Sequence, residues 1–248
     1  MRKTILKVLI LAFSFNFLFN HSLKLHSGVI ENKPTDKEIL NILGKGKSFV
    51  LEMDLDNLQT VLKLLKKYDY ENAPKKRIVD GKIFYTYKRL ENDPKKTIQE
   101  LEYLIKNPEK YQKYEKFIKK AILSLLSNGI KIYIKELKKE ISAEWIFKEK
   151  SIIFNYKSLE KGTKNFANLL SHEMIHIAQS CKGGSFVSYP VLLNLDHSKP
   201  KRFYYKYLKS KAYKNLKKSE KLLEVEAYAN EKNHIQTLNL FKNFCFKN

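Results

Sequence analysis

The stretch His172-Glu173-Met174-Ile175-His176 decides how this chain of 248 residues is interpreted. It lies within residues 163–181, where apolar side chains recur at helical spacing, and Gly183 and Gly184 follow as a stop signal. Two histidines four residues apart leave the same face of a helix, so their imidazoles can bind one metal ion together. Glu173 is turned by about 100° around the helix axis from His172, which places its carboxylate to reach a water molecule.

Besides the two histidines, a catalytic zinc site needs a third protein ligand and a coordination position left open for water or substrate. Residues 216–237 have the pattern of a last long helix and contain the sequence Glu224-Val225-Glu226-Ala227. Helical phase favours Glu226 as the ligand, because it lies nearer the expected apolar face than Glu224. His197 and His234, the only histidines after position 176, are the remaining candidates.

These motifs resemble the gluzincin class of zinc metallopeptidases, the thermolysin-like group in which a glutamate on a later helix completes an HExxH site. Gln179 and the Glu-x-Glu-Ala sequence at 224–227 are similar to the small bacterial HExxHxxQ…ExEA form of that class. The metzincin pattern is excluded, because it requires glycine and histidine where this chain has Gln179 and Lys182. The resemblance extends over residues 130–234.

The resemblance implies a zincin-like α+β fold, with a small mixed or antiparallel sheet, the HExxH helix and a later glutamate-bearing helix. It implies a Zn²⁺ ion bound by His172, His176 and Glu224, with Glu226 as the alternative in a shifted register. It also implies that Glu173 is the catalytic base in the hydrolysis of a peptide or protein substrate. In this class a strand before the HExxH helix pairs with the peptide, and residues 145–147 or 151–155 would be that strand.

An oxyanion donor is the remaining part of such a mechanism. The candidates are Tyr189, Tyr213, Tyr228, His197 and His234. Three other functions compete with peptide hydrolysis. They are a catalytically silent zincin-like binding domain, a cationic DNA-associated zinc protease, and a basic surface-binding protein in which the HExxH motif is accidental.

Hydrophobic periodicity divides the chain into two regions after its N-terminal segment. Residues 23–94 form an N-terminal α/β region of unknown role, and residues 95–248 form the zincin-like domain. Strands are expected at 48–55, 82–88 and 130–134, a hairpin at 144–147 and 151–156, and helices at 56–68 and 95–126, the last interrupted at Asn107-Pro108. Thr163 or Asn165 is the expected N-cap of the HExxH helix.

Residues 1–22 have the features of a secretory signal peptide. Basic residues at positions 2, 3 and 7 precede the 12-residue apolar run Val8–Phe19, which is too short to span a bilayer. No clear cleavage site follows, so an uncleaved N-terminal anchor is the alternative. Both readings predict export to the periplasm or the exterior, where Cys181 and Cys245 could form a disulfide. Two buried free thiols are the alternative.

Lysine dominates the charge of the chain. The sequence has 48 basic and 26 acidic residues, a net charge of +22, and only four of the basic residues are arginine. Proteins that read nucleic acids usually rely on arginine forks, so this composition argues against a nucleic-acid partner. A lysine-rich face could instead bind an anionic surface such as lipid or cell wall. The oligomeric state is not predicted.

Overall fold

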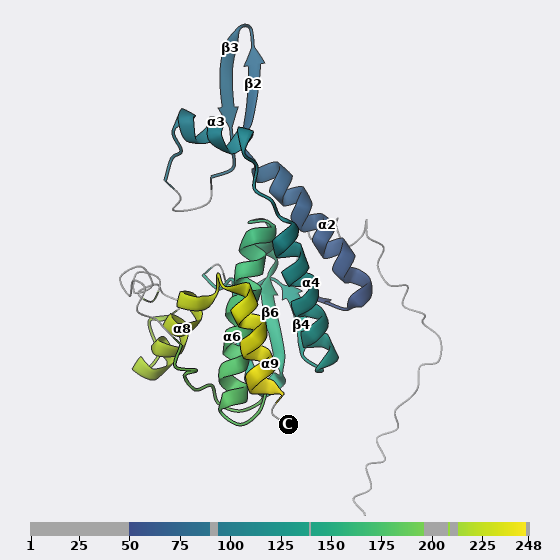
Figure 1. Cartoon of the computed structure of the whole chain (residues 1–248), viewed down its shortest axis with the longest axis vertical. Coiled ribbons are helices and arrows are strands. Elements are labelled where there is room, and N and C mark those ends of the chain that lie inside the picture. Colours follow the sequence, from purple (N-terminus) through teal and green to yellow (C-terminus); the bar gives the residue numbers. More distant parts are fainter. Residues whose placement is uncertain (1–49, 90–93, 139, 196–207, 209–212, 247–248) are drawn as a thin grey trace, which may run out of the picture. The chain divides into compact units, whose positions relative to one another are not determined.

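A computed structural model of the chain describes residues 50–89, 94–138, 140–195, 208 and 213–246. The expected signal peptide at 1–22 and His197 lie outside these residues. Helices and two sheets alternate along the described chain, so the predicted α+β class is confirmed at this level (Figure 1). Among the described residues, no helix has the length and hydropathy that crossing a bilayer requires.

A four-stranded mixed sheet, in the order β1-β4-β6-β5, forms the base of the fold. Its strands are β1 (Val50–Glu52), β4 (Lys131–Lys135), β5 (Ala143–Ile146) and β6 (Ser151–Asn155). Strands β4 and β6 are parallel, whereas β1 pairs with β4 and β5 pairs with β6 in antiparallel register. Strand β6 is buried along its whole length, and β5 is left at one edge of the sheet.

Apart from α3, the helices pack on the sheet or on one another. They are α2 (Leu55–Asn72), α3 (Ile98–Lys106), α4 (Gln112–Ser127), α5 (Tyr156–Leu159), α6 (Thr163–Lys182), α8 (Lys218–Asn230) and α9 (His234–Cys245). The predicted interruption at Asn107-Pro108 separates α3 from α4. Leu65 of α2, Ile122 of α4 and Leu170 of α6 belong to one buried cluster with the sheet. Residues 50–72, assigned above to a separate region, therefore share the core of the HExxH helix.

The expected N-caps of α6 are wrong. Gly162 is the N-cap residue and has no side chain to offer, and Thr163 is the first residue within the helix. The capping group comes from α2, where a carboxylate oxygen of Asp69 accepts the backbone N–H of Thr163 at 2.9 Å. The other oxygen of Asp69 accepts the hydroxyl of Thr163. The local sequence therefore gave no sign of a cap 94 residues away.

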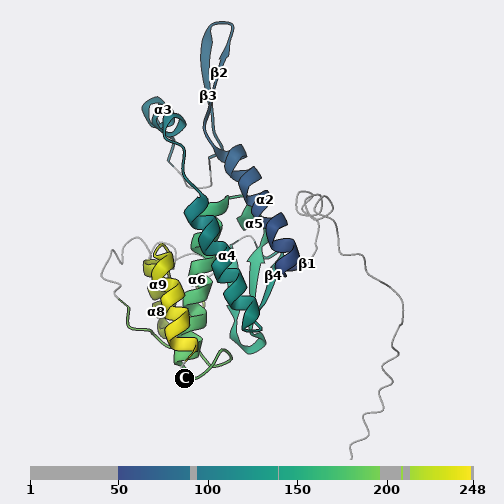
Figure 2. The same cartoon turned by 45° about the vertical axis from the view of Figure 1, so that its right-hand side comes forward.

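The expected single helix over residues 216–237 is also wrong, because two helices occupy the end of the chain. Helix α8 ends at Asn230, and α9 begins at His234 after a short turn. Asn233 causes this restart, since its side chain accepts the backbone N–H of Gln236 as an N-cap. Helix α9 lies alongside α6 in both views (Figures 1 and 2). A disulfide between Cys181 and Cys245 joins the C-terminal ends of α6 and α9.

A separate two-stranded ribbon consists of β2 (Lys75–Val79) and β3 (Lys82–Thr86). A strand was expected at 82–88, but its partner β2 was not. Asp80 and Gly81 connect the strands with positive φ angles of 49° and 72°, a tight hairpin turn for which an Asp-Gly pair is suited. At its base the ribbon contacts α3, where the hydroxyl of Tyr85 donates to Glu102 at 2.5 Å.

Candidate metal centre

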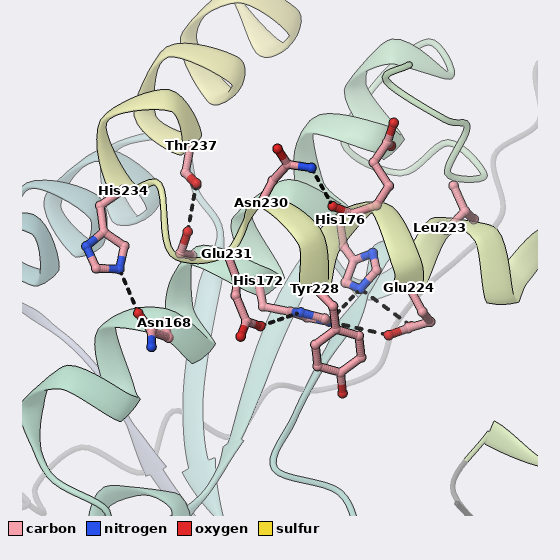
Figure 3. A network of polar contacts seen from close by, with 12 residues as sticks. Asn168, His172, His176, Leu223, Glu224, Tyr228, Asn230, Glu231, His234 and Thr237 are labelled. Atoms are coloured by element: carbon pink, nitrogen blue, oxygen red, sulfur yellow. Dashed lines mark hydrogen bonds and ion pairs between the residues drawn. The ribbon is translucent and has the colours of Figure 1, made fainter. Parts of the chain in front are cut away.

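His172 and His176 lie on the buried face of α6 with their rings turned toward each other. Their Nε2 atoms are 3.1 Å apart, and the side chain of Glu224 on α8 faces both of them. The carboxylate oxygens of Glu224 lie 3.3 Å from His172 Nε2 and 3.5 Å from His176 Nε2. Figure 3 shows the three side chains converging on one point. His172, His176 and Glu224 thus form a group that could hold a metal ion.

The other ring nitrogen of each histidine faces an acceptor. Nδ1 of His172 lies 3.2 Å from a carboxylate oxygen of Glu231, and Nδ1 of His176 lies 2.8 Å from the amide oxygen of Gln179 (Figure 3 draws the Glu231 contact). An acceptor at Nδ1 requires the proton there, which leaves the Nε2 lone pair available. Both lone pairs then point into the same space beside Glu224, where one cation can accept both of them.

The three side chains suit a zinc ion by their chemistry and lie close enough to share one. The two Nε2 atoms are 3.1 Å apart, one carboxylate oxygen of Glu224 lies 3.3 Å from His172 Nε2, and its other oxygen lies 3.5 Å from His176 Nε2. With one ligand atom taken from each residue, the three atoms lie within 4.8 Å of one another. Two imidazoles and a carboxylate are ligands that zinc commonly takes in catalytic sites.

Glu226, the alternative ligand, faces away from the histidines. Its side chain is 1% exposed and accepts hydrogen bonds from the Gln179 amide at 2.9 Å and from the backbone N–H of Leu193 at 2.8 Å. His234 is also outside the group: its Nε2 bonds to Asn168 at 3.0 Å, and its ring stacks on Phe117. The structure thus brings Glu224 to the histidines and leaves Glu226 and His234 elsewhere.

Burial and charge act in opposite directions on the pKa values of the group. Burial lowers the pKa of His172, but the hydrogen bonds that the imidazolium donates to Glu224 and Glu231 raise it well above its usual value. Burial likewise lowers the pKa of His176, and the charge of Glu224 more than offsets this. Burial raises the pKa of Glu224, yet the two imidazoles hold it far below its usual value. Glu224 is therefore an anion that favours a cation beside it.

Glu173 and two tyrosines complete the surroundings of the group. Burial raises the pKa of the Glu173 carboxyl, although His172 and His176 act against that shift. The Tyr228 ring lies 4.4 Å from the His172 ring, and the Tyr213 and Tyr228 hydroxyls are 2.7 Å apart. Burial raises the pKa of both phenols, so they remain protonated donors at neutral pH.

Tyr189 differs from these two tyrosines, because it is exposed and its hydroxyl donates to Glu220 at 3.2 Å. Two residues of the site were not assigned a role from the sequence. Glu231 was not predicted to belong to the site. It follows Glu224 by seven residues, which is about two helical turns, and this spacing places both side chains on the same face of a helix. Gln179 was noted as part of a motif, three residues after His176, a spacing at which helical side chains meet.

Comparison with known proteins yields no match: no family model fits the chain, and no curated protein or solved structure is significantly similar to it. A functional proposal therefore depends on the geometry of the site and on the motifs of the sequence.

Proposed function

We propose that the chain is a zinc-dependent peptidase of the gluzincin type with a zincin-like fold. One observation carries the proposal: His172, His176 and Glu224 offer ligand atoms that all lie within 4.8 Å of one another. Glu173, the neighbour of His172 in the HExxH motif, lies within the same buried region. The signal-like N-terminus supports a role outside the cytoplasm, in the periplasm or beyond the cell.

Each residue has a defined task in this proposal. His172, His176 and Glu224 would hold the zinc ion, which in such a site polarises a carbonyl and makes water nucleophilic near neutral pH. Glu173 accepts a proton from the attacking water and gives it to the leaving amine. The raised pKa of Glu173, caused by burial, brings the carboxyl closer to the pH at which it can do both.

The two tyrosines near the histidines are the best oxyanion donors among the candidates. Tyr228 packs against His172, and the Tyr213 hydroxyl contacts that of Tyr228. Both phenols stay protonated, because burial raises their pKa values. A neutral hydroxyl can donate to an oxygen on which negative charge develops. Tyr189 and His234 have other partners and are not needed for this task.

The sheet offers a place for an extended peptide. Among the described strands, β5 lies at the edge of the sheet, whereas β6 is enclosed between β4 and β5, so of the two expected strands β5 is the edge strand. Trp145 fastens β5 to the metal-site helix, since its indole N–H donates to the Ser180 hydroxyl at 3.0 Å. A substrate that pairs with β5 would gain backbone hydrogen bonds without depending on its sequence.

The test begins with metal analysis of the purified wild-type chain, followed by assay on a peptide library with and without a chelator. Glu173→Gln keeps the shape of the side chain but removes the base. It should retain bound zinc and lose hydrolysis by about 10²–10⁴-fold. Full activity of this variant would remove Glu173 from the mechanism. Bound zinc without turnover in the wild type would instead support a silent metal-binding domain.

A further inference from the structure

Gln179 connects the metal group to a buried carboxylate that the proposed mechanism does not use. Its side chain is fully buried, and its Oε1 accepts the Nδ1–H of His176 at 2.8 Å. Its Nε2 donates to a carboxylate oxygen of Glu226 at 2.9 Å and to the backbone carbonyl of Leu223 at 3.2 Å. Every polar atom of this amide therefore has a partner inside the protein.

Glu226 is surrounded by hydrogen-bond donors. Besides Gln179, it accepts the backbone N–H of Leu193 at 2.8 Å and that of Leu195 at 2.9 Å. Within the described part of the chain, Glu226 forms no ion pair with a basic side chain. A buried carboxylate whose described partners are all neutral donors is costly to maintain, so it points to a role beyond packing.

We propose that Gln179 and Glu226 act together as positioning residues for the metal site. Glu226 fixes the amide of Gln179 in the single orientation in which its oxygen faces His176. This inference rests on the proposed metal binding and adds a requirement to it: correct presentation of His176 depends on a carboxylate that never touches the metal.

The argument depends on the shape of an amide. The two orientations of Gln179 fill the same space, but a flipped amide would place its NH₂ against Nδ1 of His176. The imidazole would then carry its proton on Nε2, and this nitrogen could no longer bind a cation. Glu226 and the Leu223 carbonyl are both acceptors, so they bond only the NH₂ side and exclude the flipped orientation.

The same carboxylate also holds the segment that follows α6. The backbone N–H of Val191 donates to the Gln179 carbonyl at 3.1 Å, and Lys182 Nζ donates to the Leu192 carbonyl at 2.7 Å. Glu226 also accepts the backbone N–H groups of Leu193 and Leu195. Together these bonds hold residues 191–195 against α6 and α8. Glu226 thus serves both the metal ligand and the chain beside it.

The experiment has two readouts on the full chain. Competition with a chromophoric chelator measures the zinc affinity, and visible absorption records the spectrum of the Co²⁺ form. Gln179→Leu removes the acceptor for His176, and Glu226→Gln replaces an acceptor by a group that must present a donor. Both should weaken zinc binding by about 10–100-fold and alter the cobalt spectrum. Ser180→Ala is the matched control, because it removes a buried hydrogen bond of the same helix that leads to Trp145. It should leave both readouts unchanged.

A reciprocal exchange separates positioning from packing. Gln179→Glu alone sets two carboxylates side by side, while Gln179→Glu with Glu226→Gln restores one donor and one acceptor between the two positions. The double variant should bind zinc more tightly than Gln179→Glu alone. These substitutions conserve shape, so they keep the test decisive if the leucine variant does not fold.

Unchanged zinc affinity and cobalt spectra in Glu226→Gln, and in Gln179→Leu if it folds, would overturn the positioning role and leave the metal site standing. A wild-type chain that binds neither zinc nor cobalt would overturn the proposed function as well.

Discussion

Glu224 and Glu226 stand two residues apart on α8 and contact different parts of the protein. Glu224 faces the Nε2 atoms of His172 and His176, whereas Glu226 bonds to Gln179 and to backbone amides. Removing Glu224 should therefore remove a metal ligand. We expect Glu224→Ala to lose zinc under conditions that saturate the wild type. Its zinc affinity should fall by more than the 10–100-fold expected for a residue that only hydrogen-bonds to a ligand. Metal analysis after dialysis against a fixed zinc concentration measures it.

Glu220→Ala is the control for this prediction, since it removes an acid of the same helix that accepts the Tyr189 hydroxyl outside the metal group. It should keep stoichiometric zinc. Retention of zinc by Glu224→Ala would contradict the ligand set of His172, His176 and Glu224.

The histidines also predict how zinc binding depends on pH. Burial lowers the pKa of both histidines, but hydrogen bonds to Glu224 and Glu231 raise the pKa of His172, and the charge of Glu224 raises that of His176. A raised pKa means that protons compete with the metal already near neutral pH. Because Glu224 has a lowered pKa, it stays ionised and does not compete. Zinc affinity should thus fall as pH falls, by about tenfold per pH unit for each proton displaced.

Calorimetry in buffers of different ionisation enthalpy counts these protons directly. The count should lie between one and two and decrease toward alkaline pH. A zinc affinity that stays constant between about pH 8 and pH 5, the range in which histidine ordinarily titrates, would show that the histidines are not the ligands.

At the scale of single residues, the sequence predicted the part of the site that lies on a single helix. His172, Glu173 and His176 have a fixed relation within α6, so their spacing predicts that they meet. Helical phase correctly placed Glu226 on the buried side of α8, but burial did not make it a ligand. Glu224 lies nearer the solvent on a helix that packs at an angle to α6, and no single-helix argument gives that angle.

At the scale of elements, α6 depends on a cap supplied from elsewhere. Asp69 of α2 accepts both the backbone N–H and the hydroxyl of Thr163, because Gly162 offers no side chain. Gly162 has a φ of +83°, and a Cβ added there would lie 2.2 Å from Asp69 Oδ1. The glycine therefore makes room for the carboxylate, and α2 fixes the start of the helix that carries both histidines.

Loss of this cap should destabilise the protein. We expect Asp69→Ala to lower the free energy of unfolding by about 1–3 kcal/mol, since it leaves the buried N–H of Thr163 without an acceptor. Asp69→Asn keeps an acceptor of the same size and should lose clearly less. Urea unfolding of the three proteins measures the difference. Equal stability of Asp69→Ala and the wild type would show that solvent replaces the cap.

Strand β2 and the turn between α8 and α9 were not predicted, because their sequences lack the local patterns that usually mark such elements. Strand β2 carries three basic residues among its five, so it lacks the alternation expected of a strand, and pairing with β3 makes it one. The turn between α8 and α9 carries no proline or glycine, and only the Asn233 side chain marks it. Runs and alternation of apolar residues, by contrast, predicted β4, β5 and β6, because these strands line the core.

At the scale of the whole molecule, one core unites residues from both halves of the chain. Met53 near β1, Leu125 of α4 and Phe241 of α9 all belong to the cluster that buries the HExxH helix. Residues 23–94 were expected to form a region of their own, but residues of α2 and the segment before it join this core. Long-range pairing such as that of β1 with β4 depends on the complete fold, and no local pattern encodes it.

The disulfide is the strongest long-range restraint on this core. It joins Cys181 at the end of α6 to Cys245 at the end of α9, across 64 positions of sequence, and so limits the unfolded chain. Breaking it should lower the free energy of unfolding by about 2–4 kcal/mol. For a chain of this size that corresponds to a fall in Tm of roughly 5–15 °C.

Cys245→Ala and the wild type in a non-chelating reductant should give the same shift, because both remove the cross-link. Zinc affinity should change little, since the bond lies more than one helical turn beyond His176. A Tm that neither treatment lowers would mean that the packing of α9 on α6 suffices without the bond.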